Sequence, residues 1–224
     1  MARVKICGVR DEHMVRTVAR AGADWVGFVL APKSPRYIVR HGEPLSERLI
    51  DLLTVAAEAD IRSAVLVVNP EIEWLHGLTN AVLPDVIQLH GNETPAFVAE
   101  LREAVPRNTE IWKAVGVAGP SDLEAASAHT AADRLLIDAR PPEGADRTGG
   151  HGQTFDWSIL ETWHAPKPWL LAGGLTPDNV ADAIQRTQAD AVDVSSGVER
   201  VQGEKDVGLV RAFIEAARGA AANA

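Results

Sequence analysis

The 224-residue sequence has one cysteine, no apolar run approaching 18 residues, and fewer basic than acidic side chains. A single cysteine excludes an intramolecular disulfide, and the lack of a long apolar run argues against a transmembrane helix. The 22 Lys and Arg against 31 Asp and Glu leave a net charge of −9, which argues against a nucleic-acid or membrane-surface partner. The opening residues, MARVKICGVR, show no secretory signal pattern. We therefore expect a soluble cytoplasmic protein that holds any anionic ligand by local charge.

Short apolar runs, many of them β-branched, recur at intervals of 21 to 37 residues, and segments with helical spacing lie between them. Strands that alternate with short helices are typical of βαβ units on a parallel sheet, whose strands are apolar on both faces. The strands are expected to begin near Val4, Trp25, Arg62, Val86, Glu110, Arg134, Pro168 and Ala191. The helices are expected at residues 11–21, 44–59, 71–78, 95–105, 121–130, 155–161, 177–187 and 206–217.

Eight such units predict a single-domain α/β fold, the (β/α)8 or TIM barrel, over residues 1–218. A doubly wound open sheet is the alternative that this pattern leaves open. Residues 219–224, GAAANA, are expected to fray. The two longest connections, residues 31–43 and 139–154, both follow strands. Because the loops that follow strands build the active site of a barrel, the extra length lies on the expected catalytic face.

Two of the expected helices carry start signals. Thr94-Pro95 and Thr176-Pro177 each place a hydroxyl before a proline. Such a hydroxyl caps the first turn, where the missing N–H of proline costs little. These pairs predict helices that begin at residues 95 and 177.

Polar side chains collect where the expected strands end. Successive side chains of a strand point to opposite faces, so Lys5 and Cys7 share one face of the first strand. Barrel closure makes the first and eighth strands neighbours, and a buried ammonium needs an acidic partner. The sequence therefore predicts that Lys5 pairs with Asp193 inside the barrel.

The candidate catalytic residues also have purely structural interpretations. A lone cysteine is most often a small buried hydrophobe, and an Asp after an apolar strand often caps a turn. On these grounds alone Cys7, Asp138 and His90 remain open between packing and chemistry, and Arg36 of SPRY is first a solvated loop cation.

Three glycine-containing clusters follow the last three expected strands. Glycines there expose backbone N–H groups and aim a helix N-terminus at a phosphate, the recurrent phosphate site of barrels. Backbone dipoles bind an anion without a net positive protein, so the clusters predict a phosphorylated ligand. The residues are Gly149, Gly150 and Gly152, then Gly173 and Gly174, then Ser195, Ser196 and Gly197.

Other catalytic motifs are missing. The seven His residues are scattered without HExxH or Cys/His spacing, so we expect no metal ion. The sequence contains no GxSxG elbow, no GxGxxG loop and no Walker lysine motif. No other chemistry therefore competes strongly with phosphate binding.

Seven segments, in order from residue 4 to about residue 207, together resemble the phosphoribosylanthranilate isomerase family of tryptophan biosynthesis. They are VKICGVR, GADWVGFVLAPKSPRYI, IQLHGNE, WKAVGV, LLIDAR followed by GGHGQTFDW, LLAGGLTPDNV, and AVDVSSGVER with GEKD. The resemblance implies the barrel and a cofactor-free isomerisation of N-(5-phosphoribosyl)anthranilate to 1-(2-carboxyphenylamino)-1-deoxyribulose 5-phosphate.

The resemblance also implies roles for single residues. The Cys of KICG, Cys7, matches the family's general base, and the Asp that ends LLID, Asp138, matches its general acid. The Arg of SPR, Arg36, is expected to hold the anthranilate carboxylate, and the glycine clusters match the phosphate cradle. The further candidate substrate-binding residues are Gln88, His90 and Asp193.

A free thiol is mostly protonated at neutral pH, so a thiolate base needs a nearby cation. We hypothesise that Lys5, two residues before Cys7, supplies that charge. Two departures from the family pattern, His151 in place of a small residue and VLVVN in place of VFVN, touch neither proton-transfer residue.

Two other functions stay open. A sugar-phosphate isomerase of histidine biosynthesis, or a bifunctional isomerase, is expected to have an Asp where this chain has Cys7. A non-catalytic phosphate-binding barrel subunit would use the glycines but leaves Cys7, Arg36 and Asp138 without a joint purpose. In each case the partner is a small phosphorylated molecule, and the chain is expected to be a monomer or a homodimer.

Overall fold

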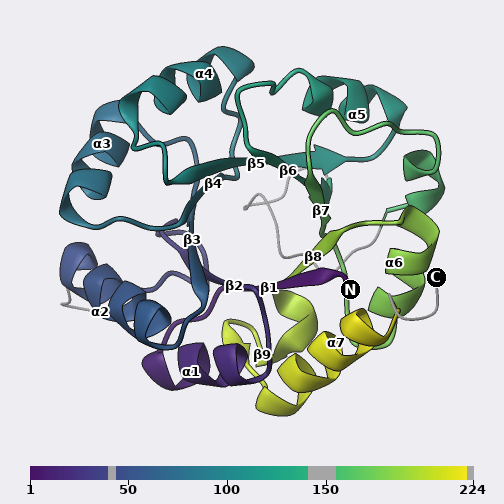
Figure 1. Ribbon diagram of the computed structural model, residues 1–224, viewed down its shortest axis with the longest axis horizontal. Coiled ribbons are helices and arrows are strands. Elements are labelled where there is room, and N and C mark those ends of the chain that lie inside the picture. The colour runs from purple at the N-terminus through teal and green to yellow at the C-terminus, as the bar shows by residue number, and fades with distance from the viewer. Residues whose placement is uncertain (40–43, 141–154, 221–224) are drawn as a thin grey trace.

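The computed structural model describes residues 1–39, 44–140 and 155–220. Eight parallel strands form a closed barrel in the order β1 to β8, which confirms the predicted fold (Figure 1). Each strand begins within one residue of its predicted start. The strands are β1 (Arg3–Cys7), β2 (Trp25–Val29), β3 (Arg62–Val67), β4 (Val86–Leu89), β5 (Glu110–Val117), β6 (Arg134–Ala139), β7 (Trp169–Leu171) and β8 (Ala191–Val194).

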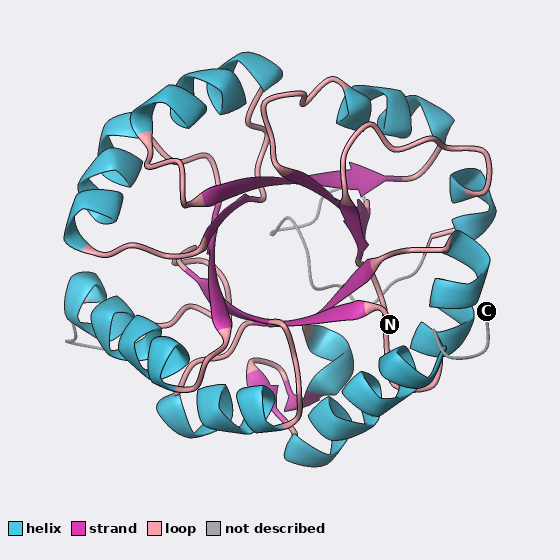
Figure 2. Cartoon of the chain, in the orientation of Figure 1, coloured by secondary structure: helices cyan, strands magenta, loops and turns pink. Residues whose placement is uncertain are grey.

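Helices surround the barrel on all sides (Figure 2). In the described chain the α-helices are α1 (Glu12–Arg20), α2 (Leu45–Glu58), α3 (Ile72–Ala81), α4 (Pro95–Ala104), α5 (Pro120–Ser127), α6 (Val180–Thr187) and α7 (Val207–Ala220). The α-helix predicted at residues 155–161 is wrong, because the 3-10 helix η1 (Trp157–Leu160) stands there. Residues three apart share one side of a 3-10 helix, and this turn buries Trp157 and Leu160 together.

The two helix-start predictions have different outcomes. Thr94 caps α4 as predicted, since its hydroxyl accepts the N–H of Phe97 at 3.2 Å. The predicted Thr176 cap is wrong, because α6 begins at Val180. The side-chain oxygen of Asn179 instead accepts the N–H of Thr176 at 2.8 Å. This contact holds residues 176–179 as a turn before the helix.

The barrel strands are buried on both faces, as expected for a parallel sheet. The outward faces pack beneath the helices. The inward faces form a separate cluster without helix residues, in which the rings of Trp25 and Trp112 meet edge to face at 5.1 Å. The other members of this interior cluster are Ala64, Val86, Ala114, Leu136, Leu170, Ala172 and Ala191.

A small hairpin follows β8 and lies outside the ring of barrel strands (Figure 1). It consists of β9 (Glu199–Val201) paired antiparallel with β10 (Glu204–Lys205), and the 3-10 turn η2 (Ser196–Val198) precedes it. Its turn contains Gly203 at φ +83°, a backbone conformation that favours glycine. The strand and helix period does not predict this hairpin.

The final helix α7 ends at Ala220, and residues 221–224 lie outside the described part of the chain. The proposed domain limit at residue 218 therefore stays a prediction. None of the helices in the described ranges has the length and hydropathy needed to span a bilayer.

Candidate active site

The candidate proton-transfer residues lie at the carboxyl ends of strands, where barrel enzymes build their sites. Cys7 ends β1, Asp138 is next to last in β6, and His90 follows β4 directly. Cys7 is 3% exposed, and the side chains of His90 and Asp138 are 11% and 13% exposed. The fold thus gathers a thiol, a carboxyl group and an imidazole at one mouth.

Lys5 connects Cys7 with Asp193 inside the barrel. The ammonium Nζ of fully buried Lys5 lies 2.9 Å from Asp193 Oδ1, which confirms the predicted ion pair. The same ammonium lies beside the thiol of Cys7, on whose pKa its charge acts. Gly27 of β2 leaves room for this contact, because a Cβ there would lie 2.9 Å from Cys7 Sγ and 3.0 Å from Lys5 Nζ.

Two cations act on the thiol of Cys7. Burial raises the pKa of this thiol, and the positive charges of Lys5 and then Lys205 oppose that rise. Lys205 Nζ donates to the carbonyl oxygen and the hydroxyl of Ser195 at 2.9 and 3.1 Å. The same hydroxyl donates to the carbonyl oxygen of Cys7 at 3.0 Å. Lys205 therefore belongs to the surroundings of the thiol, although the sequence pattern does not single it out.

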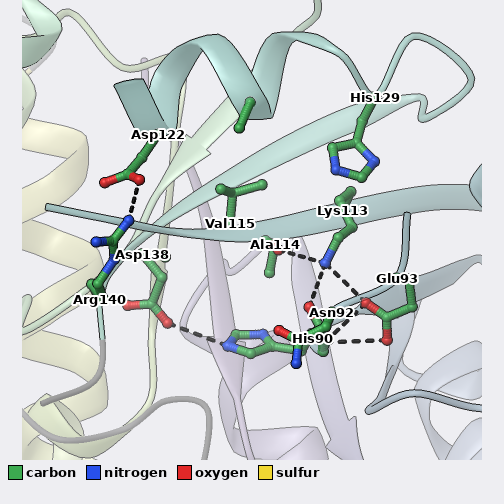
Figure 3. A pocket seen from close by; sticks show the side chains of 13 residues that line it. His90, Asn92, Glu93, Lys113, Ala114, Val115, Asp122, His129, Asp138 and Arg140 are labelled. Atoms are coloured by element: carbon green, nitrogen blue, oxygen red, sulfur yellow. Dashed lines mark hydrogen bonds and ion pairs between the residues drawn. The ribbon is translucent and has the colours of Figure 1, made fainter. Parts of the chain in front are cut away.

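His90 and Asp138 point toward one another across the mouth (Figure 3). His90 Nε2 lies 3.3 Å from Asp138 Oδ2, and the side-chain nitrogen of Gln88 lies 3.1 Å from His90 Nδ1. The other carboxyl oxygen, Oδ1, accepts the N–H of Ala139 at 2.8 Å. Both ring nitrogens and both carboxyl oxygens have partners, so the pair is held in one orientation.

A buried ion pair anchors the loop that follows His90. Lys113 Nζ lies 2.9 Å from Glu93 Oε2, and the two side chains are only 4% and 1% exposed. Lys113 also donates to the carbonyl oxygen of Gly91 at 2.8 Å. Glu93 accepts the N–H groups of Asn69 and Gly91 at 2.8 and 3.1 Å. The loops after β3 and β4 are therefore tied together behind the imidazole.

A cavity of about 460 Å³ extends from Asp138 over the end of β5 toward α5 (Figure 3). At one end Arg140 pairs with Asp122. His129 lines the other end, and its Nδ1 is buried without a hydrogen-bond partner among the described residues. Burial and the charge of Lys113 lower the pKa of His129 to about 4. This ring is therefore neutral near pH 7.

The glycines after β7 and β8 lie where a larger side chain would not fit or where the backbone has a positive φ angle. Gly173 and Gly174 adopt positive φ angles of +87° and +63°. In the described chain their N–H groups donate no hydrogen bond, which is the arrangement of an anion-binding nest. A Cβ on Gly197 would lie 1.9 Å from the carbonyl oxygen of Leu175, so only glycine fits there. Ser196 begins the 3-10 turn η2 after β8. The predicted phosphate residues that lie outside the described ranges, together with His151, are Gly149, Gly150 and Gly152.

The solvated-cation interpretation of Arg36 is wrong, because this residue is only 5% exposed. Its Nε and Nη2 donate to the two carboxylate oxygens of Glu199 at 2.7 and 2.8 Å. A Cβ on Gly8, which has φ +79°, would lie 2.6 Å from Arg36 Cδ. The side chain of Arg36 therefore lies against the turn that follows Cys7. Glu199 stands within the quoted segment AVDVSSGVER, but nothing in the pattern marks it as the partner of Arg36.

A closed barrel of eight parallel strands whose ends gather a thiol, a carboxyl group and an imidazole at one mouth has the architecture of the TIM-barrel enzymes. The family model of N-(5′-phosphoribosyl)anthranilate isomerase matches residues 4–216. The chain belongs to this family of tryptophan-biosynthetic isomerases.

Full-length relatives agree with this assignment. The N-(5′-phosphoribosyl)anthranilate isomerase of Hyphomonas neptunium is 50% identical over 218 residues, which cover 97% of this chain and 98% of that protein. The protein of the same name from Rhodospirillum rubrum is 47% identical, and the match covers 96% and 97% of the two chains.

Solved structures show the same fold. The phosphoribosyl anthranilate isomerase of Thermotoga maritima is 34% identical and superposes with a TM-score of 0.84 over 98% of this chain and all of that chain. Another solved isomerase, 32% identical with a TM-score of 0.79, covers 98% and 100% of the two chains. It was determined in complex with reduced 1-(o-carboxyphenylamino)-1-deoxyribulose 5-phosphate. The Thermotoga maritima enzyme is described as dimeric and has also been solved as monomers.

Proposed function

We propose that the chain converts N-(5-phosphoribosyl)anthranilate into 1-(2-carboxyphenylamino)-1-deoxyribulose 5-phosphate without a cofactor. One observation carries the proposal. The thiol of Cys7 has the ammonium of Lys5 as its partner, while the carboxyl group of Asp138 has the imidazole of His90. An Amadori rearrangement needs one general base and one general acid. The barrel mouth supplies both, each in its own environment.

Asp138 acts as the general acid. It donates its proton to the ring oxygen of the aminofuranose while the bond between C1′ and that oxygen breaks. The lone pair of the glycosidic nitrogen moves into the C1′–N bond and forms the protonated Schiff base. The carboxyl group is kept in place by His90 Nε2 at 3.3 Å and by the N–H of Ala139.

Cys7 acts as the general base. The Schiff base acidifies the proton on C2′, the thiolate removes this proton, and the resulting enolamine tautomerises to the ketone. Only the thiolate can accept the proton. The charges of Lys5 and Lys205 favour the thiolate against the effect of burial. Activity is therefore expected to rise with pH through the pKa of the thiol.

The substrate carries two anionic groups, and the chain offers a separate site for each. Arg36 holds the aromatic carboxylate by charge-assisted hydrogen bonds. The free N–H groups of Gly173 and Gly174 receive the phosphate, as in the recurrent phosphate site of barrels. The residues proposed to complete the phosphate site are Gly149, Gly150, Gly152, Ser195, Ser196 and Gly197. The further residues proposed to bind the substrate are Gln88, His90 and Asp193.

Substitution of the two proton-transfer residues tests the proposal. Cys7→Ala and Asp138→Asn should each lower kcat by at least about 100-fold, the usual contribution of a positioned acid or base. Affinity for the product should stay near the wild-type value, because both changes remove a step of the transition state. Fluorescence of the substrate follows turnover, and Asp51→Asn on the exposed side of α2 serves as the matched control. Near wild-type turnover in either variant would show that its assigned role is wrong.

The same assay separates the two other functions. Turnover of the histidine-pathway aminoaldose would identify a bifunctional isomerase, and an acidic first-strand residue in place of Cys7 is expected for that chemistry. Retained product binding without turnover in the unmodified chain would instead identify a non-catalytic barrel subunit.

A further inference from the structure

We infer that Glu199 is a positioning residue that orients Arg36 toward the substrate carboxylate, with the hairpin β9–β10 as its support. The inference rests on the proposed function, in which Arg36 binds that carboxylate. It gives a role to the buried carboxylate of Glu199 and to the hairpin, which is not part of the closed barrel.

Glu199 can orient Arg36 only if it leaves one edge of the guanidinium group for the substrate carboxylate; otherwise the two carboxylates would compete. A guanidinium has five N–H donors on a rigid plane, and two of its edges can bind a carboxylate through two parallel bonds. Glu199 occupies the edge formed by Nε and Nη2 of Arg36. Among the described residues Nη1 donates no hydrogen bond, so the edge formed by Nη1 and Nη2 stays available. A second carboxylate can therefore bind Arg36 without displacing Glu199.

Glu199 is itself held by two further contacts. Its side chain is 4% exposed, Lys205 Nζ lies 2.7 Å from Oε1, and the N–H of Gly203 lies 3.1 Å from Oε2. Burial acts to raise the pKa of Glu199, but the hydrogen bond from Arg36 and the charge of Lys205 outweigh it and lower the pKa. The carboxylate therefore stays charged between two cations and fixes the guanidinium in one plane.

The hairpin brings this carboxylate to the loop that carries Arg36. A Cβ on Gly203 would lie 2.6 Å from the carbonyl oxygen of Pro35, so the hairpin turn packs directly on the residue before Arg36. Arg10 donates to the same carbonyl oxygen at 3.4 Å. The segment after β8 thus supports the loop after β2. The two segments can meet because β2 and β8 are the two neighbours of β1 in the closed barrel.

Steady-state kinetics with N-(5-phosphoribosyl)anthranilate test the inference. Arg36→Met should raise KM by about 10- to 100-fold, the loss of charge-assisted hydrogen bonds to one ligand group. Glu199→Gln should raise KM by about tenfold, the scale on which a supporting group tunes the residue it orients. Its kcat should change by less than about twofold, because Glu199 takes no part in proton transfer. Glu204→Gln is the matched control, since it removes one exposed carboxylate from the same hairpin and should leave KM unchanged.

A second measurement separates an effect on Arg36 from a general loss of structure. Glu199→Gln should weaken binding of the reaction product, which carries the carboxylate, by about tenfold. Binding of ribulose 5-phosphate, which has the phosphate but no carboxylate, should stay the same. In the Arg36→Met background Glu199→Gln should add nothing, because residues that act as one unit are not additive.

The outcomes distinguish this inference from the proposed function. An effect of Arg36→Met without one of Glu199→Gln overturns the inference alone, and so does tighter product binding by Glu199→Gln. Equal weakening of product and ribulose 5-phosphate also overturns it, because Glu199 would then act through the Ser195 loop. An unchanged KM in Arg36→Met overturns the carboxylate assignment and the inference together.

If Glu199→Gln does not fold, Glu199→Asp keeps the charge at a shorter reach and should raise KM by a smaller factor than Arg36→Met.

Discussion

The thiol of Cys7 has surroundings that act in opposite directions. Burial in the barrel end raises the pKa of the thiol, whereas Lys5 and Lys205 lower it. Asp193 neutralises Lys5 in part, and this negative charge again raises the pKa of the thiol. The fraction of thiolate that Cys7 can form, and with it the proposed role as general base, therefore depends on these neighbouring cations.

Removal of the Lys5 charge should make the base weaker. Lys5→Met takes away the larger of the two cationic influences and leaves Asp193 close to the thiol, so the pKa of Cys7 should rise further. The pH profile of kcat/KM, which reports groups of the free enzyme, should move to higher pH in the same direction. Thiolate absorbance during a pH titration measures the thiol directly. The control variant Lys33→Met removes an exposed lysine and should change neither the pH profile nor the thiol pKa. An unchanged thiol pKa in Lys5→Met would contradict the hypothesis.

Single site residues differ in how far the sequence predicts them. The Lys5 and Asp193 pair follows from two simple rules, the alternation of side chains along a strand and the closure of eight strands. The bond between Arg36 and Glu199 joins residues 163 positions apart through a hairpin that has no periodic signal. Neither spacing nor composition connects them, so only the folded chain reveals this contact.

The loops after β3 and β4 depend on one buried charge pair. Glu93 accepts backbone N–H groups from both loops, and Lys113 neutralises the carboxylate from β5. Loss of one partner should cost more free energy than the attraction between the two charges contributes, because no water can replace the missing partner of a charge at this depth. The orientation of His90 at the start of the second loop depends on this anchor.

Lys113→Met should destabilise the fold strongly. The substitution leaves the carboxylate of Glu93 buried and unpaired, which usually costs about 3–5 kcal/mol in the free energy of unfolding. Urea denaturation measures the loss. Arg107→Met breaks an exposed ion pair on the surface and should change the unfolding midpoint little. A loss in Lys113→Met no larger than that of Arg107→Met would show that the pair does not anchor the loops.

Elements were predictable where one period governs them. The predicted strand starts agree with the structure within one residue. Parallel strands are apolar on both faces, so each strand of the repeat appears in the sequence as a continuous apolar run. Local side-chain bonds override that signal at helix starts, as Asn179 does before α6. The hairpin β9–β10 is too short to show a period, and the spacing at residues 155–161 predicts a helix there but does not distinguish the 3-10 helix η1 from an α-helix.

The acid excess of the chain constrains how the barrel mouth binds an anion. Lys5 pairs with Asp193, whereas Arg36 and Lys205 share the carboxylate of Glu199, so these five side chains carry one excess positive charge. We expect attraction for a doubly anionic substrate to come from this charge and from donors that remain unused. These are the free edge of Arg36 and the backbone N–H groups of the glycine nests, which carry no net charge.

The stability of the barrel should fall as the pH decreases through the range in which histidine titrates. Burial and Lys113 lower the pKa of His129 to about 4, below the value of about 6.5 of an unfolded histidine. Between these two values the unfolded chain binds the extra proton, so the free energy of unfolding decreases as pH falls. The expected loss from this residue is about 2 kcal/mol between pH 7 and pH 5. Urea denaturation at both pH values measures it in the unmodified chain, in His129→Gln and in the exposed control His13→Gln. Because His129→Gln has no proton to gain, its stability should depend less on pH than that of the other two proteins. The same pH dependence in all three proteins would show that the neutral His129 ring does not contribute.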